Sequence, residues 1–431
     1  MLALALPTTD VVARAAIVEG YNSNTYQAQD DPDVPLIKRH PSPFTGVDGS
    51  LELRWSGRDT DGASLLVGGR VQHYEPLQTE NQSDDGGANA RLSAQLTLGP
   101  RTQLTLADTA SVTTFNAAHT TDGTLFAFDP TQQRSSYWDE TLVLSIAHQL
   151  SPKWKLTQTF GGMVAGTIDS APIVLPTGGD VKHRGLDYVE PYLETDLSKD
   201  FTWRGTGDLL VLYEYAYSLF VLDLTQRPPR NIGPDKSTFV TALAGYTYAL
   251  DPERTVAVHG GLVGATAPPR DADPRPILSP SGTADFTYTR DVFNLGASVA
   301  YTWGTVNPRL GVGPTAIASV NAVGIPYHVG KWQNLALVGT MQASYQSLVT
   351  GANESTHLGL YSAGLEVRYG VNGWLGLLAG YDFRFATFSD PTSYEPPFIQ
   401  NLVYLGLSGF WSTDRAQLPI TTFASPIQPP A

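Results

Sequence analysis

Charged side chains recur on one face of segments in which every second residue is apolar. A period of two sends neighbouring side chains to opposite faces of a β-strand, so each charge lies opposite an apolar face. The set holds seven acids and five bases, namely Glu52, Glu190, Glu194, Asp196, Glu214, Glu366 and Asp382 against Arg54, Arg70, Arg91, Arg368 and Arg384. On the wall of an aqueous lumen, mixed charges can form a transverse field that orients and sorts solutes. Paired across strands, they would instead hold the wall rigid.

Two tighter groups of carboxylates could bind a cation. Glu194 and Asp196 share a face two residues apart, a spacing open to calcium binding or acid–base chemistry. Asp30, Asp31 and Asp33 form a second group in a connecting segment. A wet wall and a solvated loop are the simpler interpretations, and we predict no metal and no cofactor.

Enzymatic motifs have little support. The eight histidines form no H-x-x-x-H or H-E-x-x-H spacing, and the chain has no G-x-S-x-G or G-x-x-x-x-G-K-[ST] motif. His259, on a polar face, is the histidine of most interest, because a serine, a histidine and an acid could still meet across strands. We predict that the protein is not an enzyme.

The composition indicates a large surface that does not face water. Charged residues make up 16% and aromatic residues 10% of the 431 residues, yet mean hydropathy is −0.13 and no apolar run reaches 18 residues. There is no cysteine, so disulfides and thiolate metal sites are excluded, and the net charge of −14 argues against nucleic-acid binding. A lipid-facing surface that is not helical must be a closed β-barrel.

Two segments show the strand pattern most clearly. In 293–303 and in 335–345, apolar and polar or small residues alternate over about eleven residues, the length of a membrane-crossing strand. Similar segments recur through the chain, and a break at Thr289-Arg290-Asp291 keeps their number even. We predict eighteen strands, with sixteen as the alternative, near residues 16–27, 44–56, 64–74, 88–98, 102–115, 136–150, 154–168, 184–197, 206–220, 237–250, 254–266, 279–288, 292–304, 308–322, 333–347, 357–369, 373–388 and 400–411.

The connections alternate between short turns and long polar segments. Short turns with hairpin residues occur at 99–101, 151–153, 251–253 and 370–373. The long ones are 28–43, 75–87, 116–135, 169–183, 221–236, 267–278 and 389–399. The prediction is an all-β, antiparallel up-and-down transmembrane barrel with long extracellular loops and short periplasmic turns.

Tryptophans near strand ends suit the aromatic girdles at the two bilayer interfaces. They are Trp55, Trp138, Trp154, Trp203, Trp303, Trp374 and Trp411; sugar binding is the alternative. Asp108 breaks the pattern, because it shares a face with Leu104 and Leu106. A β-bulge near Ala107 or a position at the bilayer edge would reconcile it.

The two ends of the chain differ from the barrel pattern. Residues 1–15 combine a short apolar segment with an A-x-A site, and we interpret them as the remnant of a signal peptide cut after Ala15. Residues 16–411 form the predicted barrel. Residues 412–431 contain four prolines and no alternation, which predicts an extended periplasmic tail.

The chain resembles the porin-like outer-membrane β-barrels of Gram-negative bacteria. Gly20-Tyr21-Asn22-Ser23-Asn24 is similar to the G-Y-x-x-N opening of many such barrels. The segment 400–411 is similar to their terminal assembly strand, which ends in an aromatic residue. The family usually ends on that aromatic residue, whereas twenty residues follow Trp411 here. The resemblance implies a location in the bacterial outer membrane among its lipids, and it transfers no functional residue.

The resulting functional hypothesis is a passive channel for small polar solutes. The acid excess, together with acidic residues between 75 and 85, predicts a weak preference for cations. The first alternative is a plugged barrel that anchors or assembles an envelope complex, and an outer-membrane hydrolase is the second. Assembly as a homotrimer or with an envelope partner is left open.

Overall fold

The structure is a computed structural model, and the parts of it described here are entirely β. They comprise residues 8–23, 41–57, 61–74, 84–114, 136–169, 173–174, 180–181, 185–202, 204–219, 222–223, 230–231, 235–267, 275–290, 293–307, 311–324, 335–349, 355–388 and 398–413. Over these residues, no helix is long and apolar enough to cross a membrane.

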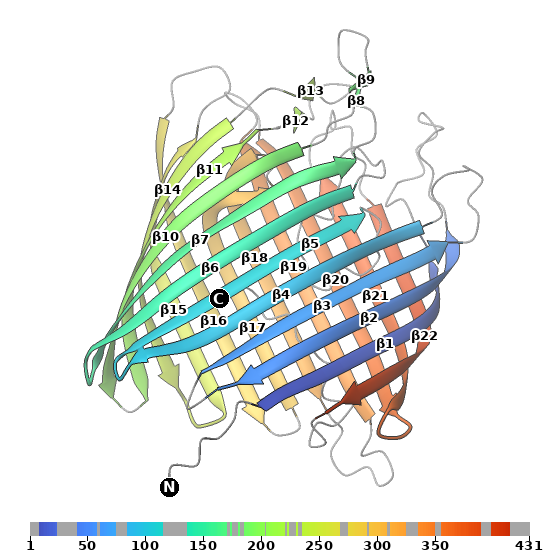
Figure 1. Cartoon of the computed structure of the whole chain (residues 1–431). Helices are drawn as coiled ribbons and strands as arrows, with labels where there is room; N and C mark the ends of the chain where they lie inside the picture. The colour runs from blue at the N-terminus through green and yellow to red at the C-terminus, as the bar shows by residue number, and fades with distance from the viewer. Residues whose placement is uncertain are drawn as a thin grey trace, which may run out of the picture.

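Eighteen long strands form one sheet (Figure 1). They are β1 (Thr8–Asn22), β2 (Ser42–Ser56), β3 (Gly62–Tyr74), β4 (Asp84–Gly99), β5 (Thr102–Thr114), β6 (Ser136–Ser151), β7 (Trp154–Asp169), β10 (Gly185–Thr202), β11 (Gly205–Ser218), β14 (Asp235–Ala249), β15 (Arg254–Ala267), β16 (Arg275–Arg290), β17 (Phe293–Asn307), β18 (Gly311–Gly324), β19 (Leu335–Val349), β20 (Ser355–Gly370), β21 (Leu375–Phe388) and β22 (Phe398–Ser412). Two small hairpins, β8 (Ile173–Val174) with β9 (Asp180–Val181) and β12 (Leu222–Asp223) with β13 (Arg230–Asn231), lie beyond one rim.

The sheet closes on itself. Each long strand pairs antiparallel with the next one along the chain, and β1 also pairs with β22, from Val12 opposite Ser412 to Asn22 opposite Leu402. Figure 1 shows this seam, where the blue β1 lies beside the red β22. The predicted up-and-down barrel of eighteen strands is therefore confirmed, and the sixteen-strand alternative is wrong.

Several predicted boundaries are tested by the strand limits. The predicted break between two strands at 289–291 is confirmed, since β16 ends at Arg290 and β17 begins at Phe293. The first strand was predicted to begin at residue 16 and begins at Thr8 instead, and Thr8–Ala15 pair with Gly49–Ser56 of β2. Apolar residues alternate poorly with polar ones over 8–15, which hid this half of β1 in the sequence. Processing after Ala15 stays a prediction, and it would remove these pairs.

Asp108 lies on the outer face without a bulge. The β4–β5 and β5–β6 registers run unbroken through it, with Leu92 on one side and Leu142 on the other. The predicted bulge near Ala107 is wrong. Asp108 also lies in the middle of β5 rather than at its end, so a bilayer-edge position does not explain it.

The short connections follow turn chemistry. Between β20 and β21, the Asn372 side-chain oxygen accepts hydrogen bonds from the backbone N–H groups of Trp374 (2.9 Å) and Leu375 (2.8 Å). The long and short sides exchange at one place: strands β17 and β18 are separated by 308–310 on the long side, and β18 and β19 by 325–334 on the short side. Elsewhere the short turns lie on one side, which is the periplasmic side in barrels of this kind.

The two faces of the wall have opposite character. Outward-facing positions carry large exposed apolar side chains, such as Leu278 (72% exposed), Leu405 (65%) and Val299 (57%). Inward-facing positions carry most of the charged and hydroxyl side chains. Exposed apolar area on this scale is stable only against lipid, so the outer face is the membrane-facing one.

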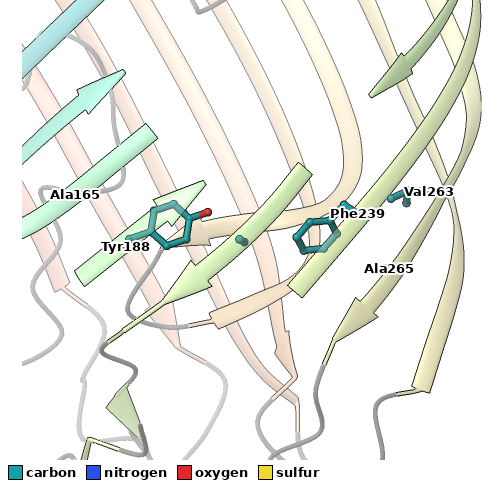
Figure 2. Packing of buried hydrophobic residues seen from close by; sticks show 6 residues of the cluster. Ala165, Tyr188, Phe239, Val263 and Ala265 are labelled. Atoms are coloured by element: carbon teal, nitrogen blue, oxygen red, sulfur yellow. The ribbon is translucent and has the colours of Figure 1, made fainter. Parts of the chain in front are cut away.

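Apolar residues on the inner face gather in two clusters. One contains Phe44 and Tyr74, whose ring centroids are 5.7 Å apart, with Val18, Leu402 and Tyr404. The other contains Tyr188 and Phe239, which come from neighbouring parts of the wall (Figure 2), with Ala165, Ala216, Val263 and Ala265. All of these side chains are at most 7% exposed, so the inner wall is covered at these two places.

Candidate functional site: the charged lumen wall

The strand registers place all twelve charged residues singled out from the sequence on inward-facing rows. Each one alternates with outward apolar neighbours, as Glu52 and Arg54 do with Leu51, Leu53 and Trp55. The charged rows occupy two separate parts of the wall. Arg54, Arg70, Arg91, Glu52, Glu366, Arg368, Asp382 and Arg384 lie on β2, β3, β4, β20 and β21, and Glu190, Glu194, Asp196 and Glu214 on β10 and β11.

The first part is an arginine-rich wall built from ion pairs. Glu52 Oε1 lies 2.6 Å from Arg54 Nε, and Glu52 Oε2 lies 2.9 Å from Arg54 Nη2 and 3.2 Å from Arg14 Nη2. One carboxylate thus holds two guanidinium groups, one of them by two parallel hydrogen bonds. Arg14, on β1, was not singled out from the sequence, because the short alternation before residue 16 did not mark a strand.

Further ion pairs extend this wall on both sides of the seam. Arg70 donates to Asp48 across the β2–β3 pair, and Arg368 donates to Glu366 two residues away on β20. The hydroxyl of Tyr404 donates to the other oxygen of Glu366 at 2.7 Å, and its ring lies over Gly380. Sequence reasoning missed Asp48, although its alternation with Val47 and Gly49 was a usable signal.

The second part is an acidic wall on β10 and β11. Tyr192 is the register partner of Glu214, and Glu190 and Glu194 stand two residues to either side of Tyr192 on the same face. Tyr188 donates a hydrogen bond to Glu190. Among the described residues, no lysine or arginine forms an ion pair with Glu190, Glu194 or Glu214. Unlike the arginine-rich wall, this wall therefore gathers carboxyl groups that have no cation partner in the described part of the chain.

The two walls face one another. In the ring of eighteen strands, β10 and β11 are the eighth and ninth, whereas β21 and β22 are the seventeenth and eighteenth, half a circumference away. The arginine-rich wall spans β20 to β4 and is thus centred on β1, beside the β22–β1 seam. Residues that are hundreds of positions apart in the chain form one side of a transverse field, with the acidic wall opposite.

His259 belongs to a hydrogen-bonded group beside the acidic wall. Its Nε2 lies 3.1 Å from Asp208 Oδ2, and its Nδ1 lies 3.2 Å from the hydroxyl of Thr283. Asp208 and His259 are two strands apart and meet over Gly245, their common register partner on β14. A methyl group at Gly245 would lie 2.0 Å from the imidazole ring, so only glycine leaves room for this contact.

An acid, an imidazole and a hydroxyl in line are also found in hydrolases. Such a site needs unpaired N–H donors for the oxyanion. Thr283 stands opposite His259 and Ala300, in a strand that is paired on both sides. The arrangement therefore favours a structural bridge across β14 over a catalytic site. Within the described residues, no group of three or more His, Asp or Glu residues could hold a metal ion.

The predicted girdle tryptophans lie at both ends of the strands. Trp55, Trp154, Trp374 and Trp411 are between 37% and 62% exposed and lie at or beside the periplasmic strand ends. Trp138 lies near the opposite end of β6, on the outward row by register. Trp303 packs against the inner cluster of Tyr188 and Phe239, and its place in the girdle stays a prediction. Alternation alone did not show this packing; Trp203 lies outside the described residues.

A closed barrel with an apolar outer belt and a charged interior is a transmembrane β-barrel. The strand pairing and the exposed apolar side chains show that this chain is such a barrel, which is the architecture of the porin-like proteins that it resembles.

No protein-family profile matches the chain, and no characterised protein matches it in sequence. Among solved structures, it is similar to the siderophore receptor PiuA from Acinetobacter baumannii (9% identity, TM-score 0.45, covering 94% of this chain and 82% of that one). It is also similar to OccAB3 from the same species (10%, 0.42, 95% and 100%) and to the outer membrane protein OpdK from Pseudomonas aeruginosa (10%, 0.41, 94% and 98%).

Proposed function

We propose that the barrel is a channel through which small polar solutes diffuse passively across the outer membrane. The observation that supports it most is the arrangement of the two charged walls on opposite sides of the lumen. A barrel that served only as an anchor would have no need for unpaired carboxylates on its inner face, where each costs desolvation unless water reaches it.

The field between the walls favours solutes that carry a dipole or a positive charge. Four of the arginines near the seam form ion pairs, with Glu52, Asp48 or Glu366. Glu190, Glu194 and Glu214, in contrast, have no cation partner among the described residues. A permeating cation would therefore meet a net negative wall. We expect a weak cation preference, because rings of carboxylates in channels select for cations.

The test is single-channel conductance of the refolded protein in a planar bilayer, with the reversal potential measured across a salt gradient. Steady openings with a cation-selective reversal potential are expected. An anion-selective potential at neutral pH would refute the charge assignment, and silence from folded, inserted protein would refute the open channel.

A matched pair of variants tests the acidic wall. Replacing Glu190, Glu194 and Glu214 together by glutamine should shift the reversal potential toward anions, because it removes three negative charges from the lumen. Glu19→Gln is the control: Glu19 is exposed on the outer face, where it accepts a hydrogen bond from Thr45. A shift in Glu19→Gln that is one third of the shift in the triple variant would mean that net charge, rather than the lumen wall, sets the selectivity.

The two buried inner clusters favour a second candidate, a barrel with a closed lumen that anchors an envelope complex. This candidate predicts no conductance and a bound partner. Affinity purification with a deletion of residues 412–431 as the comparison would test it: the tail should be needed for the partner and not for conductance. Native mass spectrometry of the same purified protein distinguishes a homotrimer from a single barrel with an envelope partner.

A further inference from the structure

One lysine of the lipid-facing surface lies among aromatic rings at the periplasmic end. Lys199, near the end of β10, is the register partner of Trp154 on β7 and of Gly207 on β11. It follows the exposed Leu193 on the same outward row. The Nζ atom lies 4.8 Å from the ring centroid of Trp154 and 5.0 Å from that of Phe201. The ammonium group is thus held in place by two cation–π contacts.

Two glycines let the aromatic rings lie flat on the wall around this lysine. A methyl group at Gly207 would come within 2.5 Å of the Phe201 ring, and one at Gly205 within 1.9 Å of the Tyr246 hydroxyl. Phe201 and Tyr246 have ring centroids 6.4 Å apart, and Tyr246 stacks on Tyr248 at the same distance. The rings of Trp154, Phe201, Tyr246 and Tyr248 therefore form a shallow platform, here called the Lys199 platform.

The charge of Lys199 has no counterion in the described part of the chain. None of the ion pairs there involves Lys199. The adjacent carboxylate, Asp200, points to the other face of the wall and accepts a hydrogen bond from Thr206 at 2.8 Å. Toward the membrane interior, the platform is continued by exposed Leu209 and Val211.

We propose that the Lys199 platform binds an anionic phospholipid of the periplasmic leaflet. Its phosphate would lie against the Lys199 ammonium, and its acyl chains would run along Leu209 and Val211. Lysine binds phosphate as a point charge, and amphipathic aromatic rings lie at headgroup level in membrane proteins. A site of this kind distinguishes a lipid by its charge and holds it at one place on the barrel. This assignment does not depend on the proposed channel activity.

Native mass spectrometry of the refolded barrel tests the proposal, with phosphatidylglycerol and phosphatidylcholine of equal chain length added to the micelles. The wild type should retain one phosphatidylglycerol in preference to phosphatidylcholine. Lys199→Gln should weaken that retention about fivefold, since one surface cation contributes about 1 kcal/mol to binding an anionic lipid. Lys199→Arg should keep the preference.

Lys155→Gln is the matched control. Lys155 lies on β7 opposite Ser198, one register position from Lys199, and faces the lumen. The Lys155→Gln variant should retain phosphatidylglycerol as the wild type does. A wild-type affinity in Lys199→Gln, or an equal loss in Lys155→Gln, would overturn the site.

A second variant and a soluble competitor complete the experiment. If Lys199→Gln does not fold, Gly207→Ala serves in its place: it displaces the Phe201 ring while keeping every charge, and it should also weaken retention. Glycerol 3-phosphate at millimolar concentration should not displace the lipid. Displacement would show a site for soluble phosphates instead of a lipid, and retention unaffected by Gly207→Ala would refute the role of the platform.

Discussion

Gly245 lies beneath the contact between His259 and Asp208, and the structure leaves no room there for a larger residue. In Gly245→Ala, the new methyl group would lie 2.0 Å from His259 Cδ2 and 2.8 Å from Asp208 Oδ2. The imidazole must turn away, which breaks its 3.1 Å contact with Asp208. Losing one partly buried hydrogen bond costs about 1 kcal/mol, and an off-rotamer side chain adds about 1 kcal/mol. Alanine recovers about 0.5 kcal/mol through its smaller backbone entropy loss in a strand. The free energy of unfolding should therefore fall by about 1.5 kcal/mol.

Guanidinium unfolding of the barrel in detergent micelles, followed by circular dichroism, measures this change. Gly260→Ala is the matched control on the neighbouring strand, because its methyl group would have no atom within 4 Å; we expect it to be neutral or slightly stabilising. In a His259→Ala background, Gly245→Ala should lose most of its cost, since the clashing ring is gone. A cost that persists in that background, or an equal cost for Gly260→Ala, would refute the bridge over β14.

Three other substitutions test the rest of the wall. Glu52→Gln leaves two guanidinium groups without their shared carboxylate. It should therefore shift the reversal potential toward anions and lower the free energy of unfolding by about 2 kcal/mol. An unchanged reversal potential would mean that Glu52 lies outside the ion path. Gly161→Ala should alter conductance by driving the Tyr192 ring, 2.1 Å from the new methyl group, into the lumen, whereas Gly162→Ala, with contacts of 3.5 Å, should not. Leu405→Arg on the lipid face should lower the free energy of unfolding in lipid vesicles by about 2–4 kcal/mol, and Ser362→Arg on the inner face should lower it much less. Equal losses would refute the assignment of the two faces.

The barrel was predictable because its signal is local. Alternation over about eleven residues reports a strand directly, and turns such as 99–101 and 370–373 mark where each strand ends. The even number of strands required one further break, and Thr289-Arg290-Asp291 gave its place. Where alternation is weak, the strand limits are not visible in the sequence: β1 begins at Thr8. Alternation also does not show that Trp303 packs against an inner cluster.

For the candidate site, the sequence predicted which face each residue lies on but not which residues contact one another. Alternation assigned Glu52, Arg54, Glu190 and Glu214 to the polar face, because a strand's period is a property of its own residues. It could not assign partners. The pair of Arg14 with Glu52 depends on the β1–β2 register. The bridge from His259 to Asp208 depends on Gly245, which lies on the strand between them and is the register partner of both.

By itself, then, the sequence determined the strand-by-strand pattern and the chemical character of each face, and it narrowed the number of strands to eighteen or sixteen. Only closure of the sheet decided that β1 meets β22, that the arginine-rich wall is assembled from both ends of the chain, and that the acidic wall of β10 and β11 lies half a circumference away. The physical reason is that side-chain direction follows from the local backbone, whereas the position of a strand around a barrel follows from the pairing of all the others.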